Sequence, residues 1–247
     1  TTPNNWGLTG QQPSHPELLD NLAVGFMEND WSIKALIREI VLSRAYQLGS
    51  DYDKGNFVAD PDNRLHWRTA PRQLDAEALR DSMLLASGNI DYERPLGSKV
   101  TDFGGGRAGR QVDPSQFGLT NIRSVYLPLI RDNLPEALSL FDFPDTIMVS
   151  TKRAQTNMPT QSLYLMNGKF IAKQSQDMAA MLSNRFSTRE ERIKAAFLLA
   201  YARPASAEEI QGCSQYFQQF GAIASRKGSD SKQAEQMALA AFCQTLL

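Results

Sequence analysis

Residues 187–220, with the sequence STREERIKAAFLLAYARPASAEEIQGCSQYFQQF, decide the fold class of this chain. Two helix-start signals of the capping-box type lie within it, Ser187 with Glu190 and Ser206 with Glu209, and Pro204 ends the first helix. Behind each signal, apolar side chains recur at the three- and four-residue spacing that places them on one face of a helix. These faces are formed by Ile193, Ala196, Phe197 and Ala200, and by Ile210, Cys213, Phe217 and Phe220. Two amphipathic helices are therefore predicted.

The neighbouring segments extend this pattern to a helical bundle over residues 159–247. One helix begins at Pro159, breaks at Gly168 and resumes to about Leu182, and the pair Asp230 and Gln233 marks the start of the last helix. Local signals therefore predict a C-terminal domain core made of packed helices.

The sequence of residues 1–50 predicts a helical hairpin. Its first helix begins at Pro16, and its second is capped by Ser32. Residues 51–158 predict a loop-rich polar segment with a central helix, which is capped by Asp75 and stopped by Gly88. Residues 49–70, which span the boundary between these two regions, show no periodicity and are interpreted as a long irregular connection. The abrupt start, and an end in mid-pattern, predict that residues 1–247 are a single-domain fragment of a longer protein.

The expected fold class is predominantly all-α, a multi-helical domain with long irregular loops. Residues 124–127 and 146–149 are candidates for one minor two-stranded ribbon, and residues 133–141 are read as a short helix between them. Short apolar runs do not by themselves separate a strand from a buried helix.

Composition excludes several classes of function. The 247 residues carry 26 basic and 27 acidic side chains, a formal net charge of -1, which is unlike a nucleic-acid-binding protein. No segment has the roughly 20 apolar residues of a membrane span. Cys213 and Cys243 form no metal-binding or haem-attachment motif, so we expect no metal. Each thiol is either a small buried apolar group or half of a bridge between adjacent helices.

The segment 123–167 is the most informative for function, because it mixes guanidinium, carboxylate, carboxamide and aromatic groups. Arginine forks bind carboxylate, sulfate or phosphate, and carboxamides bind hydroxyls, so the mixture suits an anionic or carbohydrate ligand. The same groups also suit an internal network that holds irregular loops, and both interpretations stay open. The candidate ligand-binding residues are Arg123, Tyr126, Arg131, Asp142, Asp145, Arg153, Gln161 and Asn167.

Two other groups of polar residues are weaker candidates. Asn63, Arg64, His66 and Trp67 form a second polar cluster in the irregular connection, where His66 could act as a base near neutral pH. The sequence supplies no nucleophile for it, so no catalytic residue is assigned. The charged residues at the start of the central helix, Asp75, Glu77, Arg80 and Asp81, are interpreted as a solvated face.

Ordered motifs along nearly the whole chain resemble the planctomycete-type domain of unknown function number 1553. In the first half they are PSHPELLD at 13–20, WSIK at 31–34, SRAY at 43–46, NRL at 63–65, Trp67, Arg72, LDAE at 74–77, Arg80 and Asp81. In the second half they are RSVY at 123–126, LFDFPD at 140–145, Arg153, Thr156, PTQ at 159–161, Leu163, Leu165 and Asn167.

The resemblance implies the C-terminal part of a large exported protein, located in the periplasm or at the cell surface. Its partners would be upstream domains of the same polypeptide, one of them often a cytochrome-c-like domain, so haem is expected only upstream and no cofactor in this fragment. An exported setting would permit a bridge between Cys213 and Cys243.

Three functions remain as hypotheses. The first is a non-haem accessory domain whose polar cluster binds an anionic or carbohydrate small molecule. The second is a structural scaffold that docks companion domains; it requires internally paired polar groups and an apolar patch exposed elsewhere. The third is a hydrolase that uses carboxylates such as Asp142 and Asp145, which must then face one cleft.

Overall fold

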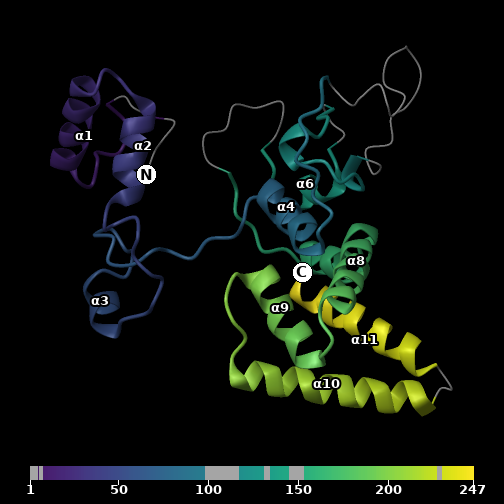
Figure 1. Ribbon diagram of the computed structural model, residues 1–247. Coiled ribbons are helices and arrows are strands. Elements are labelled where there is room, and N and C mark those ends of the chain that lie inside the picture. The colour runs from purple at the N-terminus through teal and green to yellow at the C-terminus, as the bar shows by residue number, and fades with distance from the viewer. Residues whose placement is uncertain (1–4, 6–7, 98–116, 131–133, 145–152, 227–229) are drawn as a thin grey trace. The chain divides into compact units, whose positions relative to one another are not determined.

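The computed structural model describes residues 5, 8–97, 117–130, 134–144, 153–226 and 230–247, and these are almost entirely helix and loop (Figure 1). The only pairing of the β type recorded among them is an isolated bridge between Asp91 and Ile122. This confirms the predominantly all-α class. The described residues up to Gln73 form one compact unit, and those from Leu74 onward form a second.

The N-terminal unit contains the predicted helical hairpin. Its helices are α1 (Pro16–Glu28) and α2 (Ile33–Leu42), and Ser32 caps α2 by accepting a hydrogen bond from the backbone N–H of Ala35 at 3.3 Å. The rings of Phe26 and Trp31 meet edge to face at 5.4 Å where the hairpin turns. Neither α1 nor α2 contains a buried residue, so the hairpin has little core of its own.

The connection after α2 is more ordered than its composition predicts. It contains a short helix, α3 (Lys54–Ala59), whose first turn is capped by Asp53 through the N–H of Asn56 at 2.7 Å. Six residues are too few for a periodic pattern, which is why the interpretation of residues 49–70 as irregular was wrong at this point.

The second unit begins with the predicted central helix, α4 (Ala76–Ser87), which Gly88 ends in the left-handed conformation at φ 76°. The proposed strand at 124–127 is wrong, because Ser124–Tyr126 forms a single 3-10 turn, η2. Its proposed partner, 146–149, lies outside the described residues. The short helix predicted over 133–141 is α6 (Glu136–Leu140).

The junction between α7 (Pro159–Asn167) and α8 (Lys169–Arg185) lies at the predicted break, Gly168. The N–H of Gly168 donates to Tyr164 O at 2.7 Å and closes α7, while its own carbonyl accepts from Ala172 N at 3.0 Å and opens α8. A single residue therefore ends one helix and starts the next.

The C-terminal bundle is completed by α9 (Arg189–Tyr201), α10 (Ala207–Arg226) and α11 (Ser231–Leu246), which pack with α8 as Figure 1 shows. Its core joins all four helices and Ala86 of α4; the buried members include Met178, Leu182, Ile193, Phe197, Phe217, Leu239 and Phe242. Cys243 is buried in this core and Cys213 packs against it, both as free thiols.

Of the three helix-start signals predicted for the bundle, one is confirmed and two differ from the prediction. Ser206 and Glu209 form the predicted reciprocal bonds, at 3.2 and 2.8 Å. At α9 the box is formed one residue later, by Thr188 and Glu191. Asp230 precedes α11, but its side chain makes no capping bond.

None of the helices within the described ranges is long and apolar enough to cross a membrane. In the same residues, no three or more His, Cys, Asp and Glu side chains are grouped so that they could hold a metal ion.

Candidate functional site

Six of the eight residues predicted to bind a ligand lie in the described part of the second unit; Arg131 and Asp145 lie outside the described residues. The six fall into three groups with different partners. They are Asp142 with Gln161, Arg153 alone, and Arg123, Tyr126 and Asn167.

Asp142 and Gln161 tie the end of α6 to the start of α7. The carboxylate of Asp142 accepts the backbone N–H of Thr156 at 2.7 Å and its hydroxyl at 2.9 Å. Gln161 is buried, donates to Leu140 O at 3.0 Å and accepts the N–H of Met158 at 3.1 Å. Both oxygens of the carboxylate and both ends of the carboxamide are therefore engaged within the chain.

Arg153 pairs with Glu77 of α4 as a two-pronged fork. Its Nη2 donates to Glu77 Oε1 at 2.8 Å, while Nη1 donates to Oε2, and the guanidinium lies 5.5 Å from the centre of the Phe143 ring. The hydrogen bond from Arg153 holds the pKa of Glu77 below its usual value, and the same bond raises the pKa of Arg153. The geometry that Arg153 could offer to a ligand carboxylate is thus occupied by a carboxylate of the chain.

Arg123, Tyr126 and Asn167 are more open but do not converge on one another. Arg123 Nε is 3.9 Å from Asp81 Oδ2, and its side chain is 44% exposed. Asn167 is exposed and donates to Leu163 O at 3.1 Å, and Tyr126 is half-buried in η2. None of the six described candidates lines either of the two cavities described below.

Arg80, which sequence reasoning placed on a solvated face, is the most buried charged residue of the described chain. Its side chain is only 1% exposed, so the predicted solvated face was wrong at this residue. The guanidinium donates to Ile122 O at 2.9 Å, to Ser124 Oγ at 3.2 Å, to Gly118 O at 3.4 Å and to Thr120 O. One side chain therefore holds the loop 118–124 against α4.

The next residue of α4 completes this arrangement. Asp81 accepts the backbone N–H of Ser124 at 2.8 Å and its hydroxyl at 2.7 Å, and lies 3.7 Å from Arg80. Burial lowers the pKa of Arg80 to about 10, so the group stays charged at neutral pH. We call Arg80, Asp81 and Ser124 the α4 clamp.

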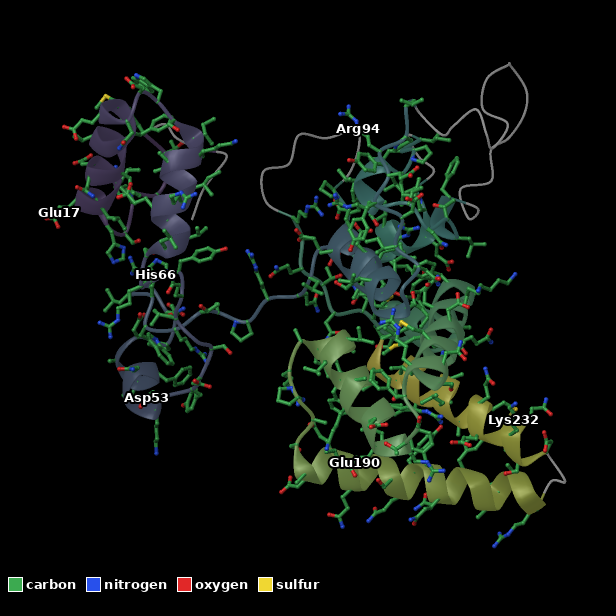
Figure 2. All side chains as sticks on the ribbon, viewed as in Figure 1. Glu17, Asp53, His66, Arg94, Glu190 and Lys232 are labelled. Atoms are coloured by element: carbon green, nitrogen blue, oxygen red, sulfur yellow. The ribbon has the colours of Figure 1, made fainter. Side chains whose placement is uncertain are left out.

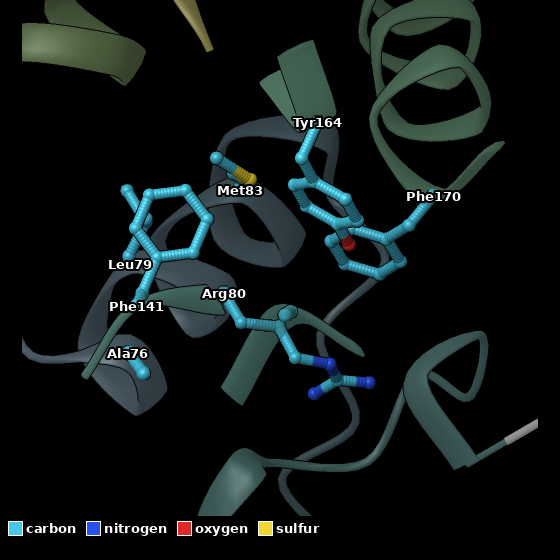
Figure 3. A pocket seen from close by; sticks show the side chains of 8 residues that line it. Ala76, Leu79, Arg80, Met83, Phe141, Tyr164 and Phe170 are labelled. Atoms are coloured by element: carbon cyan, nitrogen blue, oxygen red, sulfur yellow. The ribbon is translucent and has the colours of Figure 1, made fainter. Parts of the chain in front are cut away.

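Figure 3 shows the small cavity beside the clamp, where Arg80 runs past the rings of Tyr164 and Phe170. Its volume is only about 10 Å³, room for about one water molecule, and the Arg80 guanidinium lies 5.2 Å from the centre of the Phe170 ring. The clamp is therefore structural. Its sequence signal is that Arg80 shares a helix face with Ala76, Met83, Leu84 and Ser87, which are all buried.

The second polar cluster is brought together in the N-terminal unit, where Figure 2 labels His66. Asn63, Arg64 and His66 line a cavity of about 720 Å³, which they share with residues 11–14. Trp67 does not line it; its indole N–H donates to Asp60 O at 2.9 Å.

Replacing Arg153 tests whether its pair with Glu77 contributes to stability. We expect Arg153→Ala to lower the free energy of unfolding by about 1 kcal/mol at pH 7, because a charged fork is lost but both side chains are partly exposed. Since the pKa of Glu77 is lowered in the folded state, this contribution is fully present above its ordinary value of 4.5 and is lost as the pH falls from there through the lowered pKa of the folded state. Urea denaturation at pH 7 and pH 3 measures the difference.

The matched control is Arg123→Ala, which removes an exposed guanidinium with only a 3.9 Å contact. We expect its free energy of unfolding to stay within about 0.5 kcal/mol of wild type. Equal values for Arg153→Ala and wild type at pH 7 would contradict the structural role of the pair.

Comparison with known proteins identifies the family. The family model described as "Protein of unknown function (DUF1553)" matches residues 1–217. Neither the curated proteins nor the solved structures contain a significant match to the chain. The matched region covers both units up to the middle of α10, most of the chain. The chain therefore belongs to the DUF1553 family.

Proposed function

We propose that this domain is a docking scaffold, which uses the apolar surface of the α1–α2 hairpin to pack against a companion domain of the same polypeptide. The observation that carries the proposal is the contrast between the two units. In the second unit, Asp142, Arg153 and Gln161 are engaged with other groups of the chain, whereas the hairpin of the N-terminal unit leaves its apolar side chains uncovered.

The hairpin exposes large apolar side chains on both of its helices. Helices α1 and α2 have 13 and 10 residues, lengths at which an isolated helix is marginal in water. Most protein helices of this size are stabilised by burying one face, and neither helix does so here. The exposed apolar residues of the hairpin are Leu18, Leu19, Val24, Met27, Trp31, Ile33, Ile37, Ile40, Val41 and Leu42. A concentration of exposed apolar side chains on two short helices is typical of an interaction surface.

Charge on α1 indicates the chemistry of the part of the partner that faces this helix. The ionisable side chains of α1, Glu17, Asp20 and Glu28, are all acidic and all exposed. A surface that matches α1 therefore combines apolar side chains with lysine or arginine at its border. The proposed partner is an upstream domain with such a surface.

Hydrogen exchange tests this assignment in the longer polypeptide and in the chain alone. We expect the backbone amides of α1 and α2 to exchange at least ten times more slowly in the longer polypeptide, because docking adds the burial that the hairpin lacks. Ile37→Asp places a charge in the apolar patch and should remove this protection. The chain alone should lose little stability with the same change, since Ile37 is 53% exposed.

Leu198→Asp is the matched control, because Leu198 lies on α9 and is 54% exposed. It should leave the exchange of α1 and α2 unchanged in both proteins. Equal exchange with and without the upstream domains contradicts the proposal. So does a concentration-dependent dimer of the chain alone that Ile37→Asp abolishes, since the occupant is then a second copy.

A further inference from the structure

The cavity of the N-terminal unit is formed by two segments far apart in the sequence. Residues 11–14 precede α1, and residues 62–66 belong to the loop after α3. The rings of His15 and His66 lie 5.7 Å apart and join the two segments, and Ser14 Oγ lies 2.9 Å from His15 Nδ1. The volume of about 720 Å³ falls within the range of about 300–1,000 Å³ that is typical of small-molecule sites.

One wall of the cavity is held in a fixed shape by Asp60. Its carboxylate accepts the backbone N–H of Arg64 at 2.9 Å and that of Leu65 at 2.7 Å, and its carbonyl accepts the Trp67 indole N–H. The hydrogen bond from Leu65 is the main reason why the pKa of Asp60 is lowered. Asp60 is therefore charged at neutral pH, and the loop is preformed.

The side chain of Asn63 closes the loop by bonding to its backbone. Its side chain donates to Arg68 O at 2.7 Å and accepts the N–H of Arg68 at 3.3 Å. Asn63 and His66 both adopt left-handed backbone, at φ 52° and 54°, a conformation for which Asn and His are enriched among non-glycine residues. Within the loop, Asp60 accepts the backbone N–H of Arg64 rather than a guanidinium N–H, and the imidazole of His66 makes its ring contact with His15.

The groups that line the cavity have the chemistry of an acidic sugar site. The guanidinium of Arg64 can bind a carboxylate through two N–H groups. The imidazole N–H of His66 is a further donor to the same carboxylate. The carboxamide of Gln12 and the carboxylate of Asp62 suit hydroxyl groups, which both donate and accept hydrogen bonds. Arg64 and Asp62 carry opposite charges, so the lining offers one guanidinium for one anionic group and none for a second.

We propose that the cavity between residues 11–14 and 62–66 binds a monoanionic sugar acid, with its carboxylate on Arg64 and His66 and its hydroxyls on Gln12 and Asp62. This binding site is independent of the docking role, since it uses none of the exposed apolar residues of α1 and α2.

Calorimetric titration with D-glucuronate tests the site directly, with D-glucose and acetate as the neutral and the small anionic comparison. We expect wild type to bind glucuronate at least ten times more tightly than either comparison compound. Glucose lacks the carboxylate that Arg64 and His66 would bind, and acetate lacks the hydroxyls for Gln12 and Asp62. Arg64→Gln should weaken glucuronate binding at least tenfold. It retains the backbone N–H that Asp60 accepts, so the loop should keep its shape.

Two further variants separate binding from folding. His66→Asn keeps a residue that tolerates left-handed backbone and should weaken glucuronate binding several-fold. Arg44→Gln removes an exposed arginine of the same unit that lies outside the cavity and should bind as wild type does. The proposal is overturned if wild type does not bind glucuronate, if Arg64→Gln binds it equally well, or if acetate binds as tightly as glucuronate. Hydrogen exchange of α1 and α2 is a separate measurement, so failure of the docking role is recognised independently.

Discussion

Arg80→Met should lower the free energy of unfolding of the second unit by about 3–5 kcal/mol, the largest effect we expect from a single substitution in this chain. A methionine side chain can occupy the space of the aliphatic part of Arg80 beside Phe170, but it donates no hydrogen bond. The carbonyls of Gly118, Thr120 and Ile122 then lose the donor that satisfies them. Backbone carbonyls cannot be replaced by apolar groups, so repacking cannot compensate for the loss.

Arg80→Lys gives a graded version of the same experiment. A lysine ammonium carries three donors at one point, whereas the guanidinium of Arg80 spreads its donors over three carbonyls and the Ser124 hydroxyl. We expect a smaller loss than for methionine, and this variant keeps the test informative if Arg80→Met does not fold. Urea denaturation followed by circular dichroism measures both variants.

Arg123→Met is the control for charge alone, because Arg123 lies beside the same Asp81 but is 44% exposed. Its free energy of unfolding should stay within about 0.5 kcal/mol of wild type. If Arg80→Met is as stable as Arg123→Met, the clamp does not hold the loop 118–124.

The helices were predictable because their signals are local. Ser32, Gly88, Gly168 and the pair Ser206 and Glu209 act on residues at most four positions away, and the structure places each where the sequence does. The one-residue error at α9 has a clear cause. Both Ser187 and Thr188 are followed three residues later by glutamate, so the sequence offers two equivalent boxes. In the structure the box is formed by Thr188 and Glu191.

The pairing within the polar segment could not be predicted, because the partners lie far apart in the sequence. Arg153 and Glu77 are 76 residues apart, and Arg80 is about 40 residues from the carbonyls that it binds. The composition of segment 123–167 indicated polar contacts but not whether they are made to a ligand or to the chain. The charge of Arg80 predicts exposure to solvent, because charged side chains are usually exposed. Only its buried neighbours on the same helix face, such as Met83 and Leu84, point the other way.

In the N-terminal unit, too, the sequence pattern does not identify the packing partner. Apolar residues recur along α1 and α2 at the three- and four-residue spacing of a helix, and such a pattern implies a buried face. In the described structure that face is exposed, so the periodicity reports a surface that the hairpin alone does not cover. A pattern of this kind is satisfied by any apolar neighbour, which is why sequence alone could not say what the hairpin packs against.

Gly168→Ala should destabilise the second unit by about 2 kcal/mol, which is within the range for overpacking a close contact. Gly168 has φ -64° and ψ 131°, a backbone that alanine adopts easily, so the cost does not come from its dihedral angles. A Cβ atom at this position would lie 2.6 Å from Tyr164 O and 3.2 Å from the Tyr164 ring. Tyr164 is buried against Met83, Leu84, Phe170 and Ile171, so it cannot move away without disturbing the core between α4 and α8.

Gly212→Ala is the matched control, because Gly212 lies in α10 and an added Cβ there meets no atom within 4 Å. Alanine is the better helix former, so this variant should be more stable than wild type by up to about 1 kcal/mol. Thermal unfolding of the two variants should therefore give shifts of opposite sign from the same chemical change. A rise in melting temperature for both would show that the α7–α8 junction tolerates a side chain, and that Gly168 is then needed only to interrupt the helix.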